Sequence, residues 1–535
     1  MMKKICLLMC MMLVLCQLPL FAQEKESGAP TRSEMAELKA EISSLKDELH
    51  SLHDDVKQLL QEQAKDTFMD KLGSLITSFD DLLWGWPLII LLGAAHIFLT
   101  FRLRFIQRYI PLGVRLSVTR DDSSSGDISQ FGALSIALAA TIGTGNIIGV
   151  ATAIVKGGPG AVMWCWLFGV LGIATKYSEA LLSVKYRVRD AEGLTHGGPM
   201  YAIERGMKNK PLAIMFAVFT VIACFGIGNM TQSNAVAENM VKTLGVAQEA
   251  IPTWKGYIGL AETVLIAIVV MGGLKAVSRL CEALVPFMAA FYVIGCIIVM
   301  IICGAYVFPA IKLIVSEAFS LRAVTGGALG TAMMIALRYG VARGLFSNES
   351  GLGSAPIIAA NARTRNAVRQ ALISSTGTFW DTVIICAMTG ICVIAAMLKK
   401  NGGVEPVWSE FSAPALTSGA FEYIPVIGKY ILMVALVIFA YTTILGWYCY
   451  GEQAFHYLGG KWGLPIFRVI FVIAIFFGAV CSLDMVWNIS DIGNGLMAIP
   501  NLICLFALSK VLVSETNAYL WHGDINKKDP ECSAD

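Results

Sequence analysis

The sequence predicts an all-α polytopic membrane protein in which two membrane helices are interrupted at their centres. The chain of 535 residues is 56% hydrophobic and 15% charged, with a mean hydropathy of +0.65, which is too apolar for a soluble protein of this length. The first interruption, 137–149, places three glycines and Asn146 inside an apolar run, and the second, 343–356, is again polar and rich in glycine. Broken backbone at membrane depth must be buried in protein or line a cavity, and secondary transporters form binding sites from paired half-helices of this kind.

A helix-packing face of small residues is the alternative interpretation of the first interruption. The second interruption favours a broken helix, because paired breaks in corresponding positions of two halves indicate a transport site.

Residues 1–22 have the layout of a signal peptide, since Lys3 and Lys4 precede an apolar run that ends near Leu20. Leu20 is large for its place before a cleavage site, so an uncleaved anchor helix is the alternative. In both cases we expect the chain from Gln23 onward to be exported, which indicates a bacterial inner membrane.

Residues 23–80 are expected to form a periplasmic coiled-coil segment. Apolar residues recur at alternating steps of three and four from Met35 to Leu59, which is the spacing of a coiled-coil seam. A single amphipathic helix on the membrane is the weaker alternative, because the stripe is narrow for that purpose. The seam predicts a parallel homodimer through residues 33–62.

The transmembrane domain is expected at residues 81–515, with about eleven apolar spans. These lie at about 85–101, 131–155, 160–184, 212–243, 256–272, 280–305, 326–360, 371–398, 428–450, 465–482 and 486–513. Basic residues gather in alternate connections, which predicts that the tail of residues 516–535 is cytoplasmic. The connections 185–211 and 399–427 are expected to hold short helices or gates along the membrane surface.

The order of the spans predicts an inverted repeat. When the first span is set aside, ten remain, with the two interruptions in the first and the sixth. Five plus five spans that start on opposite sides of the membrane bring both interruptions together near its midplane.

Other classes of function have little support in the sequence. The 41 basic and 39 acidic residues form no single basic face, which argues against nucleic-acid binding. The fourteen cysteines sit singly, and no His or Cys spacing indicates zinc. We see neither the residue set of an enzyme nor the pore loops or charge rings of a channel. No cofactor is expected.

Five stretches resemble the sodium:alanine/glycine symporter family, the alanine-or-glycine:cation symporters. They are 143–146, 157–172, 198–201, 343–356 and 446–452. The resemblance covers about residues 75–515. Met163 and Cys165 depart from the residues usual in the family, and the signal peptide and coiled coil lie outside its pattern.

The resemblance implies a fold, a function and a location. The fold is the leucine-transporter-like five-plus-five inverted repeat with broken first and sixth core helices, preceded by one extra N-terminal transmembrane helix. The function is sodium-coupled uptake of alanine, glycine or both by alternating access, through a lipid bilayer and without enzymatic chemistry. Proton-coupled symport of small amino acids is the alternative.

The resemblance also implies a substrate site at the two interruptions. Free backbone N–H groups at the start of a half-helix suit a carboxylate, and Trp447 is expected to limit the size of the pocket. The expected set is Gly143, Thr144, Gly145, Asn146, Asn229, Gln232, Phe346, Ser347, Asn348 and Trp447. Asn229 and Gln232 are expected beside the substrate amino group, with hydrogen bonding between helices as an equal alternative.

The sodium ions are expected where freed carbonyls meet hydroxyl groups. The resemblance implies one site and suggests a second, with ligands Ala139, Ile142, Thr442 and Thr443 for the first and Thr141, Asn146 and Ser347 for the second. Without the resemblance, the favoured interpretation of adjacent threonines is bonding to their own helix backbone.

Ionisable residues inside the spans are further functional candidates. They are Arg338, Glu349 and Asp381, with roles either in gating ion pairs or as ion ligands. No basic residue lies within 137–149 or beside Thr442 and Thr443, which favours sodium over proton coupling.

Overall fold

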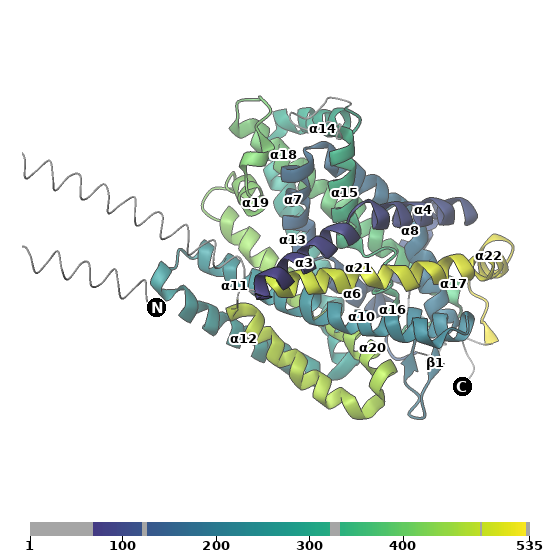
Figure 1. The fold of residues 1–535 in the computed structure, drawn as a ribbon. Helices are drawn as coiled ribbons and strands as arrows, with labels where there is room; N and C mark the ends of the chain where they lie inside the picture. Colours follow the sequence, from purple (N-terminus) through teal and green to yellow (C-terminus); the bar gives the residue numbers. More distant parts are fainter. Residues whose placement is uncertain (1–67, 120–125, 321–331, 482–483, 531–535) are drawn as a thin grey trace, which may run out of the picture. The chain divides into compact units, whose positions relative to one another are not determined.

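The computed structural model describes residues 68–119, 126–320, 332–481 and 484–530, which are almost wholly helical (Figure 1). The predicted signal peptide of residues 1–22 and the seam of residues 33–62 lie outside the described residues. Residues Ile76–Asp535 form one compact unit.

Helices account for most of the described chain. In order they are α3 (Phe68–Leu83), α4 (Trp86–Arg102), η1 (Ile106–Tyr109), α5 (Ile110–Ser117), α6 (Gln130–Thr141), η2 (Gly145–Gly149), α7 (Val150–Gly157), α8 (Gly160–Lys185), α9 (Pro199–Tyr201), η3 (Ala202–Gly206), α10 (Lys210–Phe225), η4 (Gly226–Met230), α11 (Thr231–Thr243), η5 (Gln248–Ala250), α12 (Ile251–Met271), α13 (Gly273–Ile302), α14 (Gly304–Ala318), α15 (Ala332–Asn348), α16 (Pro356–Ala359), α17 (Ala367–Thr378), η6 (Phe379–Cys386), α18 (Ala387–Lys400), η7 (Trp408–Glu410), α19 (Ala413–Phe421), α20 (Gly428–Val480), α21 (Asp484–Ala507), α22 (Ser509–Thr516) and η8 (Asn517–Trp521).

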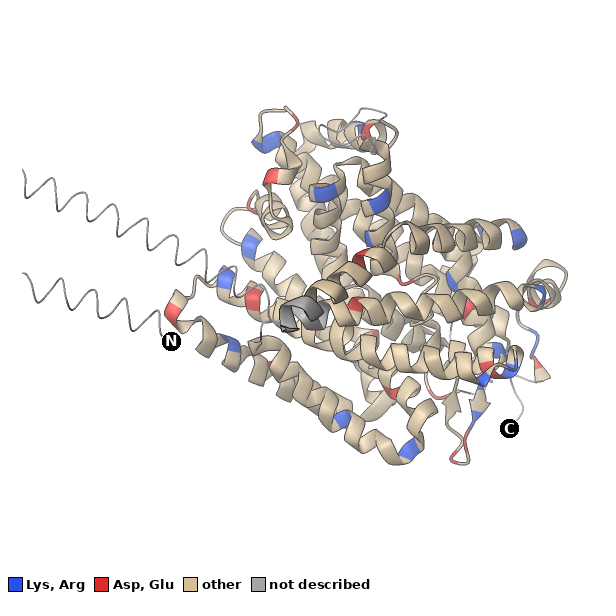
Figure 2. Ribbon diagram, in the orientation of Figure 1, with Lys and Arg blue, Asp and Glu red and all other residues tan. Residues whose placement is uncertain are grey.

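Among the described residues, eight helical stretches are long and apolar enough to cross a membrane, and a bent pair raises the number to nine. The predicted eleven spans differ for two reasons. Helix α20 runs through the two spans predicted at 428–450 and 465–482, with a non-helical residue, Gly460, between them. In the span predicted at 326–360, helix α15 is described over 17 residues from Ala332, and residues 321–331 lie outside the described part of the chain. Figure 2 shows that most of each helix ribbon is tan, with short blue and red segments, so few charges interrupt these helices.

The predicted break in the first core helix is present. Helix α6 ends at Thr141, Ile142 is extended, and the axis bends by 52° before η2 and α7. The break allows a close approach of α20, because a Cβ atom on Gly143 would lie 2.7 Å from the Thr443 hydroxyl oxygen.

The predicted break in the sixth core helix is also present. Helix α15 ends at Asn348, and positive φ angles follow at Glu349 (55°), Gly351 (96°) and Gly353 (85°). Glycine adopts such angles without the steric cost that a side chain brings, which explains two of the three residues. The chain resumes in the short helix α16.

Small residues bring the helices close together, as is usual in membranes. A Cβ atom on Gly446 would lie 2.7 Å from the Cβ of Ala140, and one on Gly478 would lie 2.6 Å from the Cα of Met230. Helix α8 packs against α15 and α17, whereas α20 packs against α10, α11 and α12. The candidate site lies where helices of these two sets contact the breaks that follow α6 and α15.

The long connections hold the short elements expected of them, and one holds a hairpin that was not expected. In 185–211, strands β1 (Val188–Arg189) and β2 (Thr195–His196) pair antiparallel, with Val188 opposite His196. In 399–427 the structure contains η7 and α19.

Candidate functional site

Asn146 is the residue through which the two broken helices meet. It is completely buried in η2. Its Oδ1 accepts a hydrogen bond from the Gly143 N–H at 2.8 Å, and its Nδ2 donates to Ser347 Oγ at 2.9 Å and to Asp381 Oδ1 at 2.7 Å. One side chain therefore joins the first break, the end of α15 and η6.

Asp381 presents a carboxylate to this junction, and its residue is completely buried. Its Oδ2 accepts from Ser347 Oγ at 2.9 Å and from Thr382 Oγ1 at 2.6 Å. A buried carboxylate is costly unless hydrogen bonds or a cation compensate it. Carboxylate and hydroxyl oxygens are donors that a hard cation prefers, whereas Asn146 turns its amide Nδ2 toward them. The sequence placed Asp381 among the ionisable candidates but outside the expected ligand sets.

The second expected sodium set is only partly assembled at this junction. Asn146 and Ser347 are in contact, as described. The Thr141 hydroxyl instead donates to carbonyls of its own helix, at 3.0 Å to Ala137 and 3.4 Å to Leu138.

The first expected sodium set is also divided. Thr443 Oγ1 donates to the carbonyl of Ala139 at 3.1 Å and to that of Phe439 at 2.8 Å, so this hydroxyl lies at the first break. Thr442 Oγ1 bonds to carbonyls of its own helix and lies 3.2 Å from Met288 Sδ on α13. Successive residues of a helix point about 100° apart, so the adjacent threonines face different neighbours. Ile142 is buried between α6 and η2.

The structure brings several expected substrate residues together around the first break. Thr144 Oγ1 donates to Gln232 Oε1 at 3.2 Å, and Gln232 Nε2 donates to the carbonyl of Ile227 at 3.0 Å. A Cβ atom on Gly145 would lie 3.3 Å from Phe346 Cδ1, which shows how closely the aromatic ring approaches the backbone.

The remaining expected residues contact other helices of the protein. Asn229 Nδ2 donates to the carbonyl of Phe471 at 2.7 Å, which is the interhelical bonding named as its alternative. Asn348 Nδ2 donates to Thr382 Oγ1 at 3.0 Å. Trp447 is fully buried, and its ring lies against Gly228, where a Cβ atom would meet the indole.

Lys176 on α8 is a candidate that the sequence argument missed. It lines a small cavity with Thr141 and Asn348, beside the first break. Its ammonium has no hydrogen-bond partner among the described residues, and Glu179 Oε2 lies 4.0 Å away. A lysine within an apolar span was the available signal. No basic residue lies within 137–149, yet the fold brings one against it.

Buried acids surround this lysine and support the second break. Glu179 Oε1 accepts from the Gly351 N–H at 2.9 Å and from Asn501 Nδ2 at 2.6 Å. Glu349 Oε2 accepts from Ser354 Oγ at 2.5 Å. Arg338 lies elsewhere, with its guanidinium 5.5 Å from the centre of the Tyr339 ring.

The chain is similar to known proteins over most of its length. A model of the sodium:alanine symporter family matches residues 69–534. The chain is 46% identical over 462 residues to an uncharacterized transporter of Haemophilus influenzae, covering 86% of this chain and 98% of that protein. It is 46% identical over 453 residues to the sodium/alanine symporter AgcS of Methanococcus maripaludis, covering 83% and 97%. The crystal structure of MhsT in complex with L-phenylalanine has the same leucine-transporter-like fold, with a TM-score of 0.54 at 14% identity over 74% of this chain and 94% of that one.

Proposed function

The chain belongs to the sodium:alanine symporter family, and on that premise we propose that it takes up alanine and glycine together with sodium by alternating access. The observation that carries the proposal is the junction of Asn146, Ser347 and Asp381, which joins both broken helices at a buried carboxylate. In transporters with such breaks, ions and substrate bind where the half-helices meet.

The proposed substrate carboxylate binds the backbone N–H groups of Thr144 and Gly145. These residues begin the helical segment of η2 and α7, where the first N–H groups lack partners within the helix and the helix dipole is positive. Phe346 and Trp447 restrict the space for a side chain, which suits glycine and alanine.

We place one sodium ion beside the Asp381 carboxylate, with the hydroxyl oxygen of Ser347, and a second between Thr443 and the carbonyl of Ala139. Asn146 positions the oxygens of the first site through its Nδ2 hydrogen bonds. Thr442 is left out of this set because its hydroxyl faces α13. In this proposal the sodium ions are transported together with the amino acid.

Proton-coupled uptake is the second candidate, and the position of Lys176 favours it. An amine without a hydrogen-bond partner among the described residues, beside Thr141 and Asn348, is a group that could exchange a proton.

One experiment separates the two candidates. Purified protein in proteoliposomes is given labelled alanine or glycine under an imposed sodium gradient, or under a proton gradient in choline buffer. We expect uptake of both amino acids with sodium and none with protons alone. Equal uptake under the proton gradient in choline buffer would contradict sodium coupling and support proton coupling.

We place the protein in a bacterial inner membrane with residues 23–80 in the periplasm and the C-terminus in the cytoplasm. The basic residues of alternate connections support this orientation, and the homodimer through residues 33–62 remains a prediction from the coiled-coil seam.

A further inference from the structure

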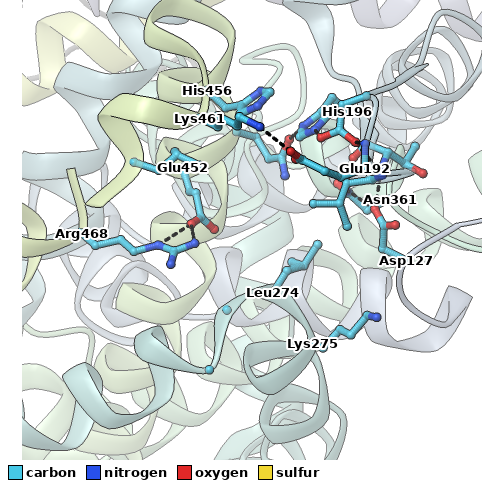
Figure 3. Close-up of a pocket in the computed structure, with 17 residues that line it drawn as sticks. Asp127, Glu192, His196, Leu274, Lys275, Asn361, Glu452, His456, Lys461 and Arg468 are labelled. Carbon is cyan, nitrogen blue, oxygen red and sulfur yellow. Dashed lines mark hydrogen bonds and ion pairs between the residues drawn. The ribbon is translucent and has the colours of Figure 1, made fainter. Parts of the chain in front are cut away.

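Three metal-ligating side chains meet at the hairpin of β1 and β2, away from the two breaks. Asp190 and His196 belong to the hairpin, and His456 belongs to α20. Their candidate ligand atoms lie within 4.8 Å of one another. The two imidazole rings are stacked, with centroids 4.0 Å apart and planes 3° from parallel, and Figure 3 shows both rings at one end of a pocket.

His196 has an oxygen acceptor at each ring nitrogen. Nδ1 lies 2.8 Å from Gln453 Oε1, and Nε2 lies 2.9 Å from Asp190 Oδ2. Nε2 is therefore the ring nitrogen that faces the carboxylate, and Nδ1 faces the side chain of Gln453. With a metal ion at Nε2, Nδ1–H would donate to Gln453, the outer hydrogen-bond partner that ligating histidines usually have.

Hydrogen bonds hold the Asp190 carboxylate in an orientation that suits a metal ligand. Its Oδ1 accepts hydrogen bonds from the N–H groups of Leu194 at 2.8 Å and Glu192 at 3.0 Å, which leaves Oδ2 facing His196. Carboxylates that bind metal ions are usually held by hydrogen bonds of this kind.

His456 supplies a nitrogen that needs a partner. Its Nδ1 is buried and makes no hydrogen bond to any described residue. We propose that Asp190, His196 and His456 bind a divalent transition-metal ion such as Zn²⁺, with the fourth position open to water. Two imidazoles and a carboxylate favour zinc, cobalt or copper over magnesium or calcium.

The geometry requires only side-chain movement. With metal–ligand bonds of about 2.0 Å, ligand atoms of a tetrahedral site lie about 3.3 Å apart. The Asp190–His196 contact of 2.9 Å would open slightly, and the wider separations would close by rotation of the rings. A pocket lined by Asp127, Glu192 and Lys275, among others, gives access to the site (Figure 3).

The ion would fasten together two sets of helices. The hairpin follows α8, which packs against α15 and α17, whereas His456 lies on α20, which packs against α10, α11 and α12. Beside the site, Lys461 and Glu192 form an exposed ion pair, which by itself contributes little. If the proposed transport function holds, such a bridge would oppose the relative movement of the two sets and slow uptake.

The test of binding uses Co²⁺, whose visible absorption is strong in a tetrahedral site. Full-length protein is purified with a tag that lacks histidine, in a His50→Ala and His53→Ala background that removes the other histidine pair. We expect one equivalent of Co²⁺ with tetrahedral bands that Zn²⁺ displaces. His196→Ala, His456→Ala and Asp190→Asn should each weaken binding about tenfold or more.

His522→Ala is the matched control, because this exposed histidine lies outside the site, and it should leave the bands unchanged. Asp190→Asn keeps the size of the side chain, so it tests the site if a histidine variant fails to fold. Absence of tetrahedral bands, or bands that survive all three site substitutions, would overturn the proposal.

A transport measurement separates this proposal from the proposed function. Zn²⁺ on the hairpin side of proteoliposomes should lower alanine uptake several-fold, and His456→Ala should lose that sensitivity. Metal binding without any alanine uptake would remove the proposed function and leave the site intact. If Zn²⁺ does not change alanine uptake and the cobalt bands are absent, the proposed metal site is contradicted and the proposed transport function is not.

Discussion

The amide Nδ2 of Asn146 lies 2.7 Å from Oδ1 of Asp381, and the two residues belong to segments more than two hundred positions apart in the chain. Ser347 bonds to both of them, so the contact links the first broken helix to the second and to η6. A cation bound at the carboxylate would therefore affect both broken helices at once.

Replacement of Asp381 by Asn should raise the sodium concentration needed for half-maximal alanine uptake by about ten- to hundredfold. The change keeps the shape but removes the charge, and hydrogen bonds to a buried charged group are worth about 1.5–3 kcal/mol. The measurement is initial uptake against sodium concentration in proteoliposomes. Glu410→Gln, an exposed acid on η7, is the control. Unchanged sodium dependence would exclude Asp381 as an ion ligand.

The adjacent threonines of α20 provide a matched pair. Thr443→Val should raise the sodium requirement severalfold while maximal uptake falls much less, because one oxygen at the first break is lost. Thr442→Val should have little effect, since that hydroxyl faces Met288 on α13. Sodium titrations of the two variants, side by side, make the comparison. Equal effects would place the ion elsewhere.

Substrate size should depend on Trp447. The wild type should transport glycine and alanine in competition and exclude leucine, whereas Trp447→Ala should admit larger side chains. Removal of one wall of an apolar pocket changes discrimination by about 1–3 kcal/mol per methylene. Competition by unlabelled amino acids measures this, with the exposed Trp462→Ala as control. Strong leucine uptake by the wild type would contradict the proposed pocket.

Both breaks could be predicted from the sequence, because glycine and polar residues inside apolar runs disfavour a continuous helix. The different orientations of the Thr442 and Thr443 side chains could not be predicted, because they depend on how α20 is rotated against α6 and α13. Lys176 is visible in the sequence as a charge within a span, but its neighbours Thr141 and Asn348 follow from helix packing. The cluster at His196 is similar: its ligands come from residues 190, 196 and 456, so no local spacing indicates it.

Substitution of Lys176 tests whether sodium or a proton is the coupling ion. Lys176→Met alone leaves Glu179 without its nearby cation, and an unpaired buried charge destabilises a protein by about 3–5 kcal/mol. The double variant Lys176→Met/Glu179→Gln removes both charges and should restore folding. We expect it to keep sodium-driven alanine uptake, measured under an imposed gradient with folding followed by thermal melting. A folded double variant that loses uptake would support the proton-coupled alternative.

Sodium and alanine should strengthen each other's binding by the same factor. Both are proposed to bind at the first break, where Asn146 also contacts Ser347 and Asp381, so each ligand orders groups that the other needs. Coupling free energies are typically about 1–3 kcal/mol, which corresponds to about 5–150-fold, and linkage requires the effect to be reciprocal. Calorimetric titration of alanine with and without saturating sodium, and of sodium with and without alanine, measures both factors. Asn146→Ala should lower alanine affinity at every sodium concentration and reduce the coupling factor, whereas His522→Ala should change neither. If alanine binds equally well in choline and in sodium, the two sites are independent and the shared junction has no role in coupling.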